Sequence, residues 1–381
     1  MIFPVKTFEA LETPFYAYNL GLLRATLDDV RLRLRGRENF RVHYAVKANN
    51  DPVVMRQIAR AGFGADCVSG REIAWAIENG FEAAKIVYSG VGKTDAEIKF
   101  AIEKGIGCFN VESVPELENI AAIAGSVRRV ANVAIRINPD IDAYTHRQIT
   151  TGTYEDQFGI PLILSHKAVE TAHADSRLHL RGLHFHIGSQ ITRMEPYRLM
   201  AAQVNRIVVS WKDKGIDFEW INVGGGLGVD YDDPDNHPVA DFEAYFSTFD
   251  AIELTPGQQL HFELGRAVVA QCGSLVSRVL YVKEGVGKKF AILDAGFTDL
   301  LRPALYGAHH KVQVLTGSNE PEESYDLVGP VCESTDCFAR SERLPRLRRG
   351  SMVAFLSAGA YGQSMASGYN MRALPRSIYF E

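Results

Sequence analysis

The sequence predicts an α/β protein made of a (β/α)₈ TIM-like barrel and a mainly antiparallel β-domain. Three observations support this: a length of 381 residues, an alternation of apolar and helical segments over residues 40–265, and short β-rich segments after Arg266. A barrel of this type needs about 250 residues, which leaves room for one smaller domain. We expect the barrel over residues 24–265, and the β-domain over residues 266–381 together with residues 1–23.

Eight short apolar segments are the candidate strands of the barrel. They are RVHYAVKA (41–48), GADCVS (64–69), KIVYSG (85–90), CFNVES (108–113), NVAIRINP (132–139), LRGLHFHIG (180–188), WINVGGG (220–226) and LHFELG (260–265). The segments between them carry apolar residues at helical spacing, as at Tyr197, Met200, Val204 and Val208. Strands that alternate with helices form parallel sheets, and eight such units close a barrel. A doubly wound open sheet is the alternative that this pattern allows.

The chain outside the barrel shows a different pattern. Beyond Arg266, short strand-like segments such as KKFAILDAG and SMVAFLSAG are separated by turn residues, which is typical of antiparallel β-structure. The segment TPFYAYN (13–19) is also strand-like and can join that domain. The segment 140–157, between two candidate barrel strands, is long and polar, as expected of an active-site flap or a disordered loop.

Composition narrows the class of protein. A net charge of −5 and a pI of about 6.1 argue against a nucleic-acid partner and against a polybasic membrane surface. The N-terminus lacks a signal-peptide pattern, and no apolar run approaches the ~18 residues of a membrane span. The five cysteines are sparse and odd in number, without metal spacing. We therefore expect a cytoplasmic protein with reduced thiols and no metal.

Polar or glycine residues stand in or at the ends of several candidate strands, where barrel enzymes place their chemistry. Each has a structural interpretation as well: a surface lysine, core histidines, a bridge from Glu263 to Arg266, or a triglycine that forms a tight turn, a dinucleotide loop or a phosphate-binding loop. A buried charge is costly unless a partner or a function supports it, and these residues converge on one barrel rim. They are Lys47, Asp66, Arg136, His184, His186, Gly224, Gly225, Gly226 and Glu263.

These residues belong to an ordered set of motifs that resembles the fold type III decarboxylases, which use pyridoxal 5'-phosphate (PLP) on an alanine racemase-like barrel. The motifs are HYAVKANN (43–50), GADCVSGREI (64–73), HFHIGSQ (184–190), NVGGGLGVDY (222–231), ELGR (263–266), DAGFTDLLRPALY (294–306), VGPVCESTD (328–336) and AYGQSMASGYNMR (360–372). The chain departs from the family pattern at Leu264, where proline is expected, and at Gln157, where lysine is usual.

The resemblance implies a homodimer that binds PLP at the barrel mouth and shares its active sites between subunits. It implies that Lys47 holds the cofactor as a Schiff base, that Glu263 lies beside the ring nitrogen, and that His186 stacks on the ring. We expect His184 to be structural, and partial burial of Lys47 to favour its neutral amine. The residues implied to contact the phosphate, the ring or the Schiff base are Gly224, Gly225, Gly226, Ser189, Gly265, Arg266, Asp66, Arg136 and Tyr361.

The reaction implied is the decarboxylation of meso-2,6-diaminopimelate to L-lysine, because the HIGSQ form and the Cys-Glu pair of VCES favour this substrate over ornithine. Cys332, from the neighbouring subunit, resembles the acid that reprotonates the α-carbon. Arginine grips carboxylates with paired hydrogen bonds. The residues that match the distal end of the substrate are Arg266, Arg302, Tyr306, Glu333 and Tyr361.

Other interpretations remain open. The first is a decarboxylase for ornithine, arginine or carboxynorspermidine. The second is a non-catalytic PLP-binding protein, which should lack Lys47 or Cys332. A racemase would need a second base that the sequence does not offer, and a dinucleotide enzyme would need the GxGxxG spacing that the triglycine lacks.

Overall fold

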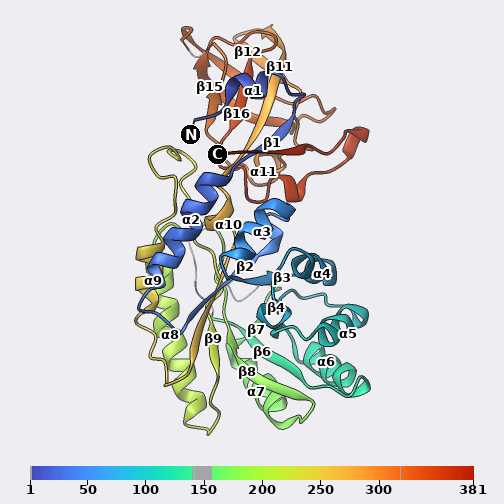
Figure 1. Ribbon diagram of the computed structural model, residues 1–381, viewed down its shortest axis with the longest axis vertical. Helices are drawn as coiled ribbons and strands as arrows, with labels where there is room; N and C mark the ends of the chain where they lie inside the picture. The colour runs from blue at the N-terminus through green and yellow to red at the C-terminus, as the bar shows by residue number, and fades with distance from the viewer. Residues whose placement is uncertain (1, 140, 142–156, 318) are drawn as a thin grey trace.

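A computed structural model shows a parallel barrel at one end of the molecule and a second, mostly antiparallel sheet at the other (Figure 1). It describes residues 2–139, 141, 157–317 and 319–381. The predicted polar segment 140–157 therefore lies outside the described residues, apart from Ile141 and Gln157. Within the described chain, no helix combines the length and apolar character needed to cross a membrane.

The barrel consists of eight parallel strands, and all eight predicted strands are confirmed. Pairing of the fourth strand with the fifth closes the sheet, which excludes the open-sheet alternative. A short ninth strand, β7 (Ile160–Pro161), was not predicted. It pairs in parallel with the last two residues of the fifth barrel strand. The eight are β2 (Phe40–Ala45), β3 (Gly64–Cys67), β4 (Ile86–Tyr88), β5 (Cys108–Val111), β6 (Ala131–Asn138), β8 (Leu178–His184), β9 (Trp220–Asn222) and β10 (Gln259–Leu264).

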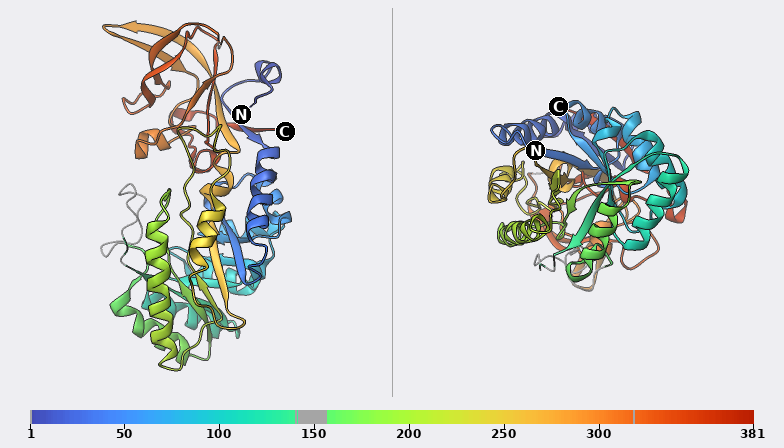
Figure 2. Two further views of the ribbon diagram at one scale, coloured as in Figure 1. Left: turned by 90° about the vertical axis from the view of Figure 1, so that its left-hand side faces the viewer. Right: turned by 90° about the horizontal axis from the view of Figure 1, so that it is seen from below.

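Helices surround the strands, as the view along the barrel shows (Figure 2). Side chains at their first residues fix where several of them begin. Ser69 and Ser113 cap two helices, and Thr94 with Glu97 forms a capping box for the helix between them. The helices are α2 (Leu20–Arg33), α3 (Pro52–Arg60), α4 (Gly70–Glu78), α5 (Asp95–Lys104), α6 (Val114–Ser126), α7 (Ser165–Ala174), α8 (Glu195–Lys212), α9 (Phe242–Phe249) and α10 (Arg266–Val269).

The second sheet is built around one long strand, β11 (Gly273–Gly285). Most of its pairs are antiparallel, as predicted, but β12–β14 and β1–β17 are parallel. The N-terminal strand β1 lies between β11 and β17, so the first and last strands of the chain are neighbours. The remaining elements are α1 (Val5–Glu9), β1 (Phe15–Asn19), β12 (Lys288–Leu293), α11 (Arg302–Tyr306), β13 (Val312–Val314), β14 (Glu322–Val328), β15 (Cys337–Pro345), β16 (Met352–Phe355) and β17 (Arg376–Phe380).

The parallel register gathers the carboxyl ends of the barrel strands at one end, called here the barrel mouth. Strand β10 lies between β2 and β9, with Glu263 opposite His43 of β2 and His261 opposite Asn222 of β9. The mouth faces the second sheet, because the first helix after β10 leads directly into β11 (Figure 1). Residues from both parts of the chain can therefore meet there.

Candidate active site

Glu263, on β10, is buried and carries three hydrogen bonds. Its Oε1 accepts from the side-chain amides of Asn110 and Asn222 at 2.8 and 2.7 Å, and its Oε2 lies 2.9 Å from Nε2 of His184. Burial by itself raises the pKa of Glu263, but the charge and hydrogen bond of His184 outweigh it and hold this pKa well below the usual range. Glu263 is therefore an ionised carboxylate in a fixed orientation. His184, expected to be structural, directly supports it.

A chain of hydrogen bonds joins Glu263 to Asp66. The amide of Asn110 donates to both Glu263 and Oγ of Ser89, the latter at 2.9 Å, and Ser89 donates to Asp66 at 2.8 Å. Burial and the charge of Glu263 raise the pKa of Asp66 to about 7, although Lys47 acts in the opposite direction. Two carboxylates of contrasting acidity thus share one polar network across the barrel.

Lys47 follows β2 in a single turn of 3₁₀-helix, Val46–Ala48. Its side chain is 43% exposed, and its Nζ lies 3.7 Å from the buried carboxylate of Asp66. Burial lowers the pKa of Lys47, but the carboxylates of Asp66 and Glu263 outweigh it, so the net pKa lies above its ordinary value. The expectation that burial would favour a neutral amine is therefore wrong for the cofactor-free chain, because Asp66 stabilises the ammonium form.

The triglycine lies just beyond β9 and approaches the neighbouring backbone closely. A Cβ on Gly225 would stand 1.8 Å from the backbone oxygen of Glu263, and one on Gly226 would stand 2.4 Å from that of Gly188. The N–H of Gly225 donates to Nδ1 of His186 at 3.2 Å. Burial, together with the charges of Arg136 and Lys47, lowers the pKa of His186 well below its ordinary value, so its ring is neutral.

Arg266 begins α10 at the barrel mouth and is buried. Its guanidinium donates to the hydroxyls of Ser189 at 3.0 Å and Tyr231 at 2.7 Å, and it lies 5.0 Å from the ring centre of Tyr361. Gly265, just before it, has a Cβ position 3.4 Å from the Tyr361 hydroxyl. Nothing in the described chain places a carboxylate in an ion pair with Arg266.

Arg302, the first residue of α11, is a second buried arginine without a carboxylate partner among the described residues. Its Nη1 lies 2.8 Å from Nε2 of His310, and its guanidinium carbon lies 4.8 Å from the ring centre of Tyr231. Tyr306 stands one helical turn further along α11. The two arginines therefore flank Tyr231, and their uncompensated charges make this region suited to anions.

Tyr361 lies in the segment between β16 and β17 and reaches the barrel through its backbone, whose N–H donates to the oxygen of Ala48 at 2.7 Å. Arg136, on β6, is also buried near the site, where its charge lowers the pKa of His186. Its Nη1 is 2.6 Å from Oε1 of Glu112, and Glu112 also accepts from the N–H of Gly159. The guanidinium of Arg136 is thus occupied by an internal ion pair.

Cys332 and Glu333 have described contacts with other residues than those of this group. Cys332 is exposed, and its backbone N–H lies 3.4 Å from the side-chain oxygen of Asn370. Glu333 accepts from the hydroxyl of Tyr369 at 2.9 Å. The described contacts of both residues stay within the second sheet and its loops. The structure of a single chain therefore does not bring either residue to Lys47.

Sequence reasoning missed the supporting residues of the site. Asn110 and Asn222 are polar residues within predicted apolar strands, and that pattern could have singled them out. Tyr231 stands inside the motif NVGGGLGVDY without having been assigned a role. Ser89 and Glu112 are likewise polar residues within predicted strands, whereas His310 gave no signal in the sequence.

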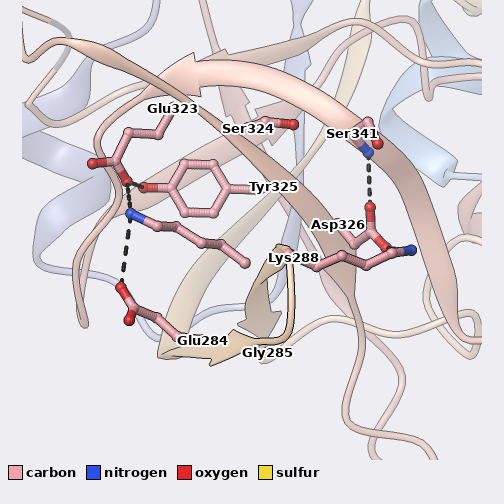
Figure 3. A pocket seen from close by; sticks show the side chains of 10 residues that line it. Glu284, Gly285, Lys288, Glu323, Ser324, Tyr325, Asp326 and Ser341 are labelled. Carbon is pink, nitrogen blue, oxygen red and sulfur yellow. Dashed lines mark hydrogen bonds and ion pairs between the residues drawn. The ribbon is translucent and has the colours of Figure 1, made fainter.

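A hollow of about 540 Å³ lies elsewhere, on the second sheet (Figure 3). Its charged side chains are already paired: Lys289 lies 2.7 Å from Glu323, and Lys288 lies 3.2 Å from Asp326. None of the residues discussed above lines it. We therefore place the candidate site at the barrel mouth.

The barrel mouth fits a phosphorylated aromatic aldehyde such as PLP. A half-exposed amine stands at Lys47, and an ionised carboxylate stands deeper in the barrel at Glu263. The glycine loop packs directly against the ends of neighbouring strands at this mouth, since a Cβ there would collide with backbone. Arg266 offers a positive charge that no described carboxylate neutralises. No group of three or more His, Cys, Asp or Glu in the described chain could hold a metal ion.

Comparison with known proteins agrees with this geometry. The family model described as "Pyridoxal-dependent decarboxylase, pyridoxal binding domain" matches residues 21–270. The chain therefore belongs to the pyridoxal-dependent decarboxylases, and the match covers the barrel described above.

Within that class, the similar proteins carry one name. A diaminopimelate decarboxylase of Bacteroides thetaiotaomicron is 52% identical over 376 residues, which cover 98% of this chain and 97% of the relative. The diaminopimelate decarboxylase of Zymomonas mobilis is 40% identical, with 96% and 87% covered. The crystal structure of the Helicobacter pylori enzyme complexed with L-lysine superposes with a TM-score of 0.93 at 38% identity, covering 99% of this chain and 93% of that one. The chain belongs to the diaminopimelate decarboxylase family.

Proposed function

We propose that the chain catalyses the decarboxylation of meso-2,6-diaminopimelate to L-lysine and carbon dioxide, the last step of lysine biosynthesis, in the cytoplasm. The observation that carries this proposal is the pair of buried guanidinium groups, Arg266 and Arg302, which flank Tyr231 without a carboxylate partner in the described chain. If Arg266 serves the cofactor phosphate, Arg302 is left for a carboxylate at the far end of the substrate. Ornithine, arginine and carboxynorspermidine carry only the carboxylate that such a reaction removes.

The cofactor is PLP, which when bound supplies an electron-withdrawing ring that accepts the electron pair of the broken C–C bond. Lys47 provides the amine that holds the aldehyde carbon, and Glu263 would keep a proton on the ring nitrogen. His186, neutral and hydrogen-bonded to Gly225, would lie against the ring. The residues proposed to hold the cofactor are Lys47, Asp66, Arg136, His186, Ser189, Gly224, Gly225, Gly226, Glu263, Gly265, Arg266 and Tyr361.

Substrate selection depends on the charged residues that would contact the distal end of the substrate. Arg302 and Tyr306 bind the distal carboxylate, together with Arg266 and Tyr361 at the boundary with the cofactor. Glu333 binds the distal ammonium group. A site built for these charges leaves them unpaired when a diamine precursor without the second carboxylate is bound, which disfavours that substrate.

The proposal includes a homodimer with shared active sites. The thiol of Cys332 donates its proton to the α-carbon once carbon dioxide has left. Cys332 and Glu333 are exposed and contact no barrel residue of their own chain in the described structure. Both are therefore accessible to the site of a second copy.

The decisive experiment incubates the purified enzyme and PLP with meso-diaminopimelate and identifies the products by mass. We expect L-lysine and one equivalent of carbon dioxide. Parallel reactions with ornithine, arginine and carboxynorspermidine serve as controls and should release little carbon dioxide. Release from ornithine without release from diaminopimelate would overturn the proposal in favour of the alternative substrate class.

A further inference from the structure

His310 is a buried histidine that the reaction described above does not use. It lies between α11 and β13 and is 3% exposed. Its Nδ1 lies 2.9 Å from the backbone oxygen of Leu356, and its Nε2 lies 2.8 Å from Nη1 of Arg302. The ring therefore links the end of β16 to the guanidinium at the substrate end of the site.

These two contacts fix the protonation state of the ring. The oxygen of Leu356 can only accept, so Nδ1 of His310 carries the hydrogen, and Nε2 must accept from Arg302. Burial and the charge of Arg302 lower the pKa of His310 to about 3. A protonated ring would turn an N–H toward the guanidinium, losing the hydrogen bond and opposing two positive charges. His310 is therefore a neutral acceptor.

A neutral acceptor beside Arg302 leaves the charge of the guanidinium uncompensated, which a carboxylate would not. An Asp or Glu at this position would orient Arg302 equally well but would also neutralise its charge. The imidazole orients the guanidinium and leaves its charge uncompensated, and no described carboxylate supplies that compensation elsewhere. The rings of His310 and Tyr231 also pack edge to face, with ring centres 5.2 Å apart. His310 therefore contacts both Arg302 and the tyrosine that lies beside it.

We propose that His310 is a positioning residue for substrate selection. It holds Arg302 through a hydrogen bond to a neutral acceptor, so that the charge of the guanidinium stays available for the distal carboxylate of the substrate. This inference rests on the proposed function, since it assumes a substrate with a second carboxylate. It assigns a specific reason for a histidine, rather than an acid, behind Arg302.

The test compares two substitutions of the same shape and different charge, His310→Gln and His310→Glu, in the holoenzyme. Gln can donate to Leu356 and accept from Arg302, so its KM for diaminopimelate should stay within about three-fold of wild type. Glu should raise KM at least ten-fold while kcat changes less than three-fold, because only binding of the distal carboxylate is weakened. His309→Glu places the same charge on the exposed neighbour and should leave both constants unchanged.

A binding measurement separates this role from a general structural one. L-Lysine and cadaverine differ by one carboxylate, and calorimetry gives the Kd of each. His310→Glu should weaken L-lysine at least ten-fold and leave cadaverine within two-fold. Equal weakening of both ligands, or an unchanged Kd for L-lysine, would overturn the inference.

Two further comparisons keep the inference testable. If His310→Glu does not fold, His310→Gln and His310→Leu decide: the Gln variant must retain L-lysine affinity and the Leu variant must lose at least ten-fold. A wild-type enzyme that releases no carbon dioxide from diaminopimelate would refute the proposed function. A working wild type with unaltered His310 variants would refute only the role of His310.

Discussion

At the scale of single residues, Asp66 makes the folded chain sensitive to pH. Its pKa is about 7 in the folded chain and about 4 when unfolded, so folding favours its protonated form. Asp66 therefore costs no stability below about pH 4, and its cost grows until about pH 7, reaching on the order of 4 kcal/mol. Urea unfolding of the cofactor-free chain should show this loss as pH rises. Asp66→Asn should remove it, and equal pH slopes for both proteins would contradict the assignment.

Lys47 is the residue on which cofactor attachment depends. Lys47→Ala should abolish turnover, because no other amine is described beside Asp66 at the barrel mouth. Borohydride reduction of the wild-type holoenzyme should add the cofactor mass to the peptide that contains Lys47, and the variant should show no labelled peptide. Lys99→Ala is the matched control, because Lys99 is an exposed lysine on α5 that pairs only with the exposed Glu103 in the described chain. This variant should be labelled at Lys47 and active like wild type.

The sequence predicted the residues with distinctive motifs and missed those that support them. Lys47 and Glu263 could be predicted because each stands in a motif of a known family. Asn110 and Asn222 could not be assigned, because their role exists only where three strands bring them to one carboxylate. The resemblance also gave Cys332 a role in the site of a neighbouring subunit, and this placement stays a prediction, because the described contacts of Cys332 do not reach the barrel of its own chain.

At the scale of elements, the glycine loop after β9 is the part least able to accept a side chain. A methyl group on Gly225 would stand 1.8 Å from the backbone oxygen of Glu263, and neither strand end can retreat without breaking barrel pairing. Gly225→Ala should therefore lower stability by about 1–3 kcal/mol and weaken PLP binding at least ten-fold. Thermal unfolding and cofactor titration measure both.

Gly92 provides the control for that substitution. It has open space around its Cβ position, and its φ is not in the left-handed region. Gly92→Ala should therefore leave both the unfolding temperature and PLP affinity unchanged. A Gly225→Ala variant that behaves like Gly92→Ala would show that the loop can move, contrary to the packing described here.

The existence of the barrel strands was predictable from apolar runs, but their ends were not. The prediction for the seventh strand continued to Gly226, whereas β9 ends at Asn222; the prediction for the sixth continued to Gly188, whereas β8 ends at His184. In both cases the hydrogen bonding between strands stops where the chain begins to contribute residues to the candidate active site. Short apolar patterns identify a strand, while the contacts that end it come from other segments.

At the scale of the whole molecule, the proposed shared site predicts complementation between two inactive variants. Lys47→Ala and Cys332→Ala should each be nearly inactive. When the two are mixed and allowed to exchange subunits, half of the dimers are mixed, and each has one intact site, so about a quarter of wild-type activity should return. Carbon dioxide release from the mixture measures this.

The same experiment tests the alternative. If each site were complete within one chain, mixing would restore nothing, because every site would still carry one of the two lesions. Size-exclusion chromatography with light scattering should show two chains per particle before and after mixing.

The position of β1 between β11 and β17 has a consequence for synthesis. Domains generally fold in the order in which they leave the ribosome, the N-terminal part first. Here the earliest strand has its partners among residues 273–276 and 376–380, so it stays unpaired while the whole barrel emerges behind it. The barrel can close on the nascent chain, whereas the second sheet waits for residue 380. During that interval an unpaired, apolar strand edge is exposed to chaperones and to other nascent chains.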